Sequence, residues 1–143
     1  MGRQEPKASN AIEIEVSPGE LFDRISILEI KQERIKAAEQ LINIRYELGR
    51  LREAQSRLPK FAADVGRLRV QLKSVNESLW DIEDEIRACE AAQSFGSRFI
   101  ELARSVYREN DQRAGIKREI NILLESAIIE EKSYTPYDAS AEK

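Results

Sequence analysis

The stretch from Lys60 to Ala92 carries apolar side chains that alternate at spacings of four and three residues without a break. They are Phe61, Val65, Leu68, Leu72, Val75, Leu79, Ile82, Ile86 and Cys89. Only an α-helix places side chains with these spacings on one face. At 1.5 Å per residue such a helix would be roughly 50 Å long, and its apolar face would need partners of similar length. The pattern therefore predicts one long helix around which the other segments pack.

The segments before this helix supply candidate partners. Ser17-Pro18-Gly19-Glu20 is a helix-start signal, with Ser as the N-cap, Pro at the first helical position and Glu placed to reach back to the cap. A second apolar stripe begins at Leu41 and ends before Pro59, because the residue that precedes a proline is disfavoured in a helix. Ala37-Ala38 contains no helix breaker, so the sequence leaves open whether residues 18–57 form one bent helix or two helices joined by a turn.

The last helix is predicted from about Ser97 to Glu130, and Gly96 would supply the left-handed turn before it. Residues 11–16 alternate apolar and acidic side chains, which predicts a short strand that would pair with residues 131–134 or with a second copy of the chain. The fold class is all-α: a long antiparallel three- or four-helix bundle or coiled-coil hairpin, with a short N-terminal strand. One helical domain, residues 11–134, would lie between a disordered tail at 1–10 and a flexible tail at 135–143.

Composition narrows the classes of function. The 23 basic and 26 acidic residues are interspersed and give a net charge of −3, which disfavours nucleic acid as a partner. The chain has no apolar run near 18 residues and no signal-peptide pattern, so we expect a cytoplasmic protein without membrane insertion. It has no histidine, and its single cysteine, Cys89, lies in the apolar stripe, so we expect no disulfide framework, no metal and no cofactor.

A polar section interrupts the apolar stripe of the last helix. Antiparallel packing of the last two helices would bring Trp80 opposite Asn110 and Asn76 opposite Arg113. The candidate ligand-binding residues are Trp80, Glu83, Arg87, Tyr107, Asn110, Asp111, Arg113 and Lys117.

Three interpretations of these residues are open. They could form a hydrogen-bonded polar layer that fixes the helix register, or a solvated face. They could instead form a pocket for a small anionic ligand, with Arg113, Lys117 and Arg87 as charged partners and Trp80 or Tyr107 as a stacking wall. A carboxylate metal site would use Asp81, Glu83, Asp84 and Asp111, but the second carboxylate pair of such sites is missing.

The first helix has secondary candidates in Asp23 and Glu29, although Asp23 and Arg24 also suit an ion pair on the surface. The chain has no nucleophile with an adjacent base, no glycine-rich phosphate loop and no CxxC motif, which disfavours an enzyme. We therefore favour a non-catalytic interaction or scaffold module that is homodimeric and binds a protein partner. The alternative is a binder or enzyme for a small anionic ligand, a nucleotide or sugar nucleotide, in a pocket between helices.

Four segments resemble a bacterial family of small helical proteins of unknown function: SPGELFDRISILEIKQERI, VNESLWDIEDEIR, FIELARSVYRENDQRAGIKREIN and EEKSY. The resemblance spans residues 17–134 and carries no assigned activity. Some members of that family are associated with surface polysaccharides or glycosyltransferases, which implies work on the cell envelope. The family tends to break the helix where this chain has Ala37-Ala38, so the resemblance favours a turn there.

Overall fold

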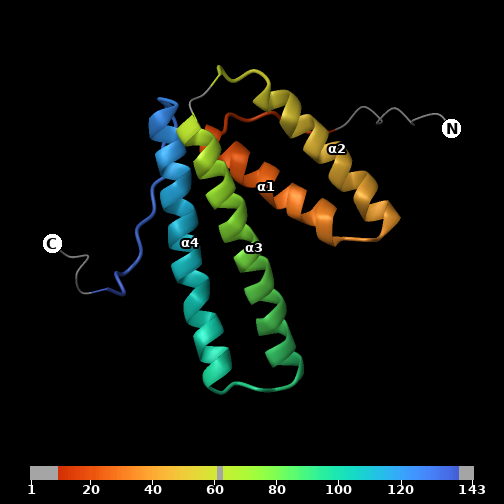
Figure 1. The fold of residues 1–143 in the computed structure, drawn as a ribbon, viewed down its shortest axis with the longest axis vertical. Coiled ribbons are helices and arrows are strands. Elements are labelled where there is room, and N and C mark those ends of the chain that lie inside the picture. The colour runs from red at the N-terminus through yellow and green to blue at the C-terminus, as the bar shows by residue number, and fades with distance from the viewer. Residues whose placement is uncertain (1–9, 61–62, 139–143) are drawn as a thin grey trace.

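The computed structural model describes residues 10–60 and 63–138, which form four α-helices (Figure 1). They are α1 (Pro18–Arg34), α2 (Ala38–Gln55), α3 (Ala63–Ala91) and α4 (Ser97–Leu123). The all-α prediction is confirmed, and residues 35–37 form a turn that separates α1 from α2. Phe61, residues 1–9 of the predicted tail at 1–10 and residues 139–143 of the predicted C-terminal tail lie outside the described residues.

The predicted N-terminal strand does not form within the described part of the chain. Residues 11–16 belong to no helix or sheet, and Ile12 is 86% exposed. Residues 131–134, the candidate partner segment, are not in a strand either. The alternation of apolar and acidic residues is therefore not sufficient for a strand here, because a strand also needs a paired neighbour.

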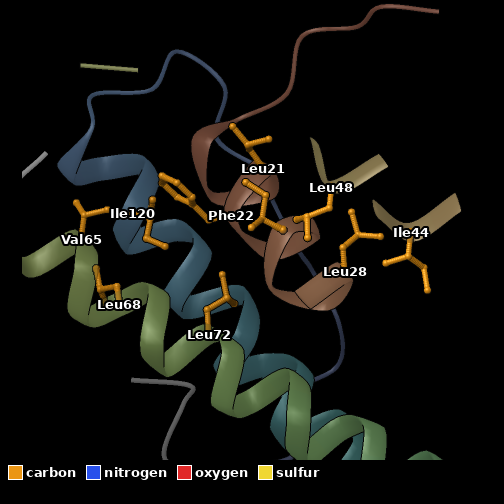
Figure 2. Close-up of a cluster of buried hydrophobic side chains, with 10 residues drawn as sticks. Leu21, Phe22, Leu28, Ile44, Leu48, Val65, Leu68, Leu72 and Ile120 are labelled. Carbon is orange, nitrogen blue, oxygen red and sulfur yellow. The ribbon is translucent and has the colours of Figure 1, made fainter. Parts of the chain in front are cut away.

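α1 is the helix that packs against each of the other three. Apolar side chains from all four helices meet around it, as Figure 2 shows for Phe22, Leu48, Leu72 and Ile120. The buried residues of this cluster are Leu21, Phe22, Ile25, Leu28, Ile44, Leu48, Val65, Leu68, Leu72 and Ile120, and Ile30 and Leu102 are buried as well. A helix with apolar residues around most of its circumference is expected in the interior, and α1 takes that place.

Of the two predicted bundles the four-helix one forms, and its helices differ in length. α1 and α2 have 17 and 18 residues, whereas α3 and α4 have 29 and 27, so the first two helices cover only part of the long α3–α4 hairpin (Figure 1). We call residues 82–106, which include the turn between α3 and α4, the arm. In α3 the fully buried residues end at Asn76. In the arm Leu102 is buried, but other apolar positions, such as Ile82, Ile86 and Phe99, are only half-buried.

Both long helices end in the same hydrogen-bonded motif. Gln93 and Glu125 have a φ of 53°, and the amides of Ser94 and Ser126 donate to the carbonyls of Cys89 and Asn121. This is the Schellman arrangement, which satisfies the last carbonyls of a helix. Two expectations are corrected as a result: Gln93 rather than Gly96 makes the left-handed turn, and α4 ends at Leu123 rather than near Glu130.

Candidate functional site

Asp23 of α1 lies where α1, α3 and α4 meet, and it is only 2% exposed. Its Oδ1 accepts a hydrogen bond of 2.8 Å from Asn76 Nδ2, which also donates to Ser26 Oγ. Its Oδ2 lies 3.4 Å from Arg113 Nε and 3.9 Å from Lys117 Nζ. We call these five residues the Asp23 cluster. The surface interpretation of Asp23 is therefore wrong, because burying a carboxylate requires this set of charged and hydrogen-bonding partners.

Lys117 is the most enclosed cation of the site, with a side chain that is 13% exposed. Its Nζ lies 2.6 Å from Glu20 Oε2 and 3.2 Å from Glu130 Oε2, in addition to Asp23. Burial lowers the pKa of Lys117, but the hydrogen bond to Glu20 and the nearby carboxylates outweigh it and raise the pKa above its ordinary value. Burial raises the pKa of Glu20, and the hydrogen bonds from Lys117 and Arg24 outweigh it and lower that pKa. Both groups are charged near neutral pH.

The start of α1 is held against α4. The Ser17 hydroxyl accepts the Glu20 amide at 3.1 Å, so the predicted N-cap is confirmed. The Glu20 side chain was expected to reach back to the N-cap residue Ser17. It binds Arg24 and Lys117 instead. The Gly19 amide donates to Asn121 Oδ1 at 2.7 Å. The Asn121 side chain of α4 thereby accepts a hydrogen bond from a backbone amide in the first turn of α1, where the helix itself offers no acceptor.

The segment that follows α4 runs back along it (Figure 1). We call residues 128–138 the strap. Glu130 accepts from Ser17 and Lys117. Three more contacts hold the strap: Glu131 with Arg118 at 3.2 Å, Lys132 with Asp111 at 2.8 Å, and the ring of Tyr137 with that of Tyr107 at 4.9 Å between centroids.

A groove of about 960 Å³ lies between α4 and the strap. We call it the α4 groove. Its α4 side includes Tyr107, Asn110, Asp111, Arg113 and Lys117. These are five of the eight candidate residues, and the structure brings them together on one surface. Its volume is in the range of small-molecule sites in proteins.

The three remaining candidates, which lie on α3, are placed elsewhere. The Trp80 ring lies under the Arg34 guanidinium, 5.7 Å from it. Glu83 and Arg87 form an exposed ion pair at 3.4 Å. The antiparallel packing of α3 and α4 nevertheless brings Asn76 near Arg113, as the sequence predicts, since both side chains contact Asp23.

The other candidates form isolated ion pairs. Glu29 lies 3.9 Å from Arg52. Of the carboxylates considered for a metal, Asp81 accepts from Arg34 and Asp111 from Lys132. Within residues 10–60 and 63–138, no three histidine, cysteine or acidic side chains are grouped as metal ligands.

Sequence reasoning missed four residues of the site: Ser17, Asn121, Glu130 and Tyr137. Ser17 was recognised as a cap, but a cap signal does not indicate a second partner. The sequence places Glu130 at the end of the last predicted helix, where its side chain would project from the helix rather than return to Lys117. Only the end of α4 at Leu123, which no glycine or proline marks, makes this return possible.

Fold and site together define an all-α protein of four helices with a charged groove along its last helix. The chain belongs to the family of unknown function DUF6165, whose profile matches residues 12–142. No curated protein and no solved structure matches the chain. Among the described residues, no helix is both long and apolar enough to cross a membrane.

Proposed function

We propose that the α4 groove binds a small ligand through an anionic group that pairs with Arg113. The observation that carries the proposal is how Arg113 is held. Its Nε faces the buried Asp23 at 3.4 Å, and the residue lines the groove. Its two terminal nitrogens have no acceptor among the described residues. A guanidinium that faces Asp23 with its Nε leaves its two terminal nitrogens as a pair of donors, which suits a carboxylate or phosphate.

The surroundings of Arg113 support a ligand with a planar or apolar part beside the anionic group. Tyr107 and Tyr137 contact each other at one end of the groove, and Val106 and Ala114 add apolar surface. Asn110 adds an amide that can donate and accept. Nucleotides and sugar nucleotides combine these features, so they are the first ligands to test.

Thermal-shift measurements with nucleotides, sugar nucleotides and divalent ions test the proposal. A ligand at ~100 times its dissociation constant should stabilise the protein by about 2.7 kcal/mol. Arg113→Lys keeps the charge but removes the paired donors, and we expect it to abolish the stabilisation while the protein still folds. Arg104→Lys, on the exposed part of α4 outside the groove, is the matched control and should respond like the wild type. A response that survives Arg113→Lys would reject the assignment.

A second candidate function is a homodimeric interaction module that uses the arm. The observation that favours it is the lack of cover on the arm, where Phe95 is 47% and Ile100 is 55% exposed. Packing two arms together would complete a bundle of four helices and remove these side chains from water. The candidate partner is therefore a second copy of the chain.

Light scattering tests this second function directly. The chain has a mass of 16.4 kDa, and the dimer should have twice that mass at micromolar concentration. Ile100→Glu should produce a monomer, whereas Ile42→Glu, at a position of α2 that is 65% exposed, should leave the dimer intact. A wild-type protein that is monomeric under these conditions would exclude the arm as a self-association surface.

A further inference from the structure

We infer that Ser17 and Lys117 form a second anion subsite of the α4 groove, and that Glu130 occupies it as a displaceable stand-in for a carboxylate of the ligand. The inference rests on the ligand-binding function proposed for the groove. It adds the chemical class of a second group on the ligand and the identity of the residue that this group replaces.

The geometry of Glu130 is that of a bound ligand. Its Oε1 accepts from Ser17 Oγ at 3.1 Å, and its Oε2 accepts from Lys117 Nζ at 3.2 Å. Ser17 is fully buried and Lys117 is nearly so, which means that packing holds both donors in place. The Ser17 hydroxyl accepts from the Glu20 amide, so its own proton is directed to the incoming carboxylate.

Glu130 is the carboxylate that can leave. The side chains around Lys117 are 3% exposed for Asp23, 22% for Glu20 and 48% for Glu130. Asp23 and Glu20 are fixed on α1, whereas Glu130 lies on the strap. Residues 129–137, which the structure describes, belong to no helix or strand. Displacing Glu130 therefore breaks no secondary structure.

The charges at the subsite select the class of group that can replace Glu130. Lys117 already faces three carboxylates, and Arg113 and Arg24 supply the other nearby positive charges. Replacing the Glu130 carboxylate by a singly charged oxyanion leaves the net charge of the subsite unchanged. A doubly charged phosphate monoester would add a negative charge beside Glu20 and Asp23, which Coulomb repulsion disfavours. The subsite is therefore suited to a carboxylate or a phosphodiester.

Chemical rescue tests the subsite in the full-length chain. Acetate is titrated against chloride at constant ionic strength, and binding is followed by the NMR signals of the Ser17 and Lys117 amides. Glu130→Ala should bind acetate about tenfold more tightly than the wild type, since an internal carboxylate that fills the subsite about nine-tenths of the time lowers apparent affinity by that factor. Glu119→Ala, at an exposed position of α4 outside the groove, is the matched control and should behave like the wild type.

Two further probes separate singly charged anions from doubly charged ones. Dimethyl phosphate should bind Glu130→Ala as acetate does, whereas methyl phosphate at pH 8, where it is doubly charged, should bind more weakly. Glu130→Gln, which keeps the size of the side chain, should show a smaller gain for acetate, and circular dichroism checks that each variant folds. Equal acetate affinities for Glu130→Ala and Glu119→Ala would overturn the inference, as would preferential binding of methyl phosphate.

The inference and the proposed function fail in different ways. If a ligand stabilises the wild type through Arg113 but Glu130→Ala gains no acetate affinity, only the second subsite is rejected. If Glu130→Ala binds acetate but no ligand stabilises the wild type, the subsite stands and the proposed function is rejected.

Discussion

Gly19 lets the first turn of α1 lie directly against α4. A Cβ atom at this position would be 2.5 Å from the carbonyl oxygen of Lys117 and 2.9 Å from Asn121 Oδ1. The first of these atoms belongs to the backbone of a helix and cannot move without moving α4. The hydrogen bond from the Gly19 amide to Asn121 depends on the same close approach. One missing methyl group thus determines how closely the two helices approach.

Gly19→Ala should destabilise the protein by about 1–3 kcal/mol, the usual cost of overpacking a filled interior. Gly49→Ala should instead stabilise it by about 0.5–1 kcal/mol, because Gly49 lies within α2 with no atom within 4 Å of the added Cβ, and alanine is the better helix former. Urea unfolding of the two variants measures both changes in the free energy of unfolding. A Gly19→Ala variant that is as stable as the wild type would contradict the close approach at Gly19.

Asp23 is a buried carboxylate, and the free energy of unfolding should depend strongly on its charge. Asp23→Asn keeps the size of the side chain but removes the carboxylate that faces Arg113 and Lys117. We expect a loss of about 3 kcal/mol, because removing one member of a buried charged set leaves the other charges uncompensated. Asp81→Asn, which removes an exposed partner of Arg34, should cost less than about 1 kcal/mol in the same urea experiment. Similar losses for the two variants would show that Asp23 is not an essential charge.

At the scale of the elements, α1 is joined to α4 by the ion pair of Glu20 with Lys117, and this pair predicts a dependence of stability on pH. The pKa of Glu20 is lowered below its ordinary value of 4.5, so the stabilisation is present above pH 4.5 and is lost as the pH falls below it. The pKa of Lys117 is raised above 10.5, so its stabilisation is complete below pH 10.5 and is lost above it.

Urea unfolding between pH 3 and pH 6 should show this loss on the acid side. Glu20→Gln should lower stability at pH 6 and make the curve flatter below pH 4.5, because the variant has no carboxylate to protonate at this position. Glu53→Gln, which affects an exposed ion pair on α2, should leave the slope nearly unchanged. Parallel curves for Glu20→Gln and the wild type would show that the Glu20 pair does not contribute.

The elements also show what the sequence could reveal. Periodicity and the Ser17 cap were enough to predict the long helices and the start of α1, because these depend on local spacing. The spacing at Ile82 and Ile86 is the same as at Leu68 and Leu72, yet only the latter pair is fully buried. Burial depends on how far α1 extends along α3, and this is a tertiary property.

Within the site, the α4 residues were predictable because polar side chains interrupt an apolar stripe there. Asp23 carried a usable signal, since apolar residues surround it on α1 and a helix of that kind is interior. Glu130 carried none. It reaches Lys117 only through the Schellman turn at Glu125, where a residue other than glycine takes a positive φ.

At the scale of the whole molecule, the packing divides the chain into a base and an arm. In the base, α1 is in contact with α2, α3 and α4, and the fully buried side chains surround it. The arm consists of two helices and their connecting turn, and most of its apolar side chains are half-buried. Regions with few buried contacts open locally at lower free energy than the global unfolding of the protein.

Hydrogen exchange should therefore separate the two parts. We expect the amides of residues 22–30 in α1 to exchange only through global unfolding, and those of residues 86–100, at the end of the arm, to exchange at least about tenfold faster through local opening. The measurement is made at low and at high protein concentration, because a second copy that covers the arm would slow exchange there and leave α1 unchanged. Equal protection of both regions at low concentration would mean that the arm is held as firmly as the base. Slower exchange of the arm at high concentration would instead support the dimer, and it would identify the surface that a second copy covers.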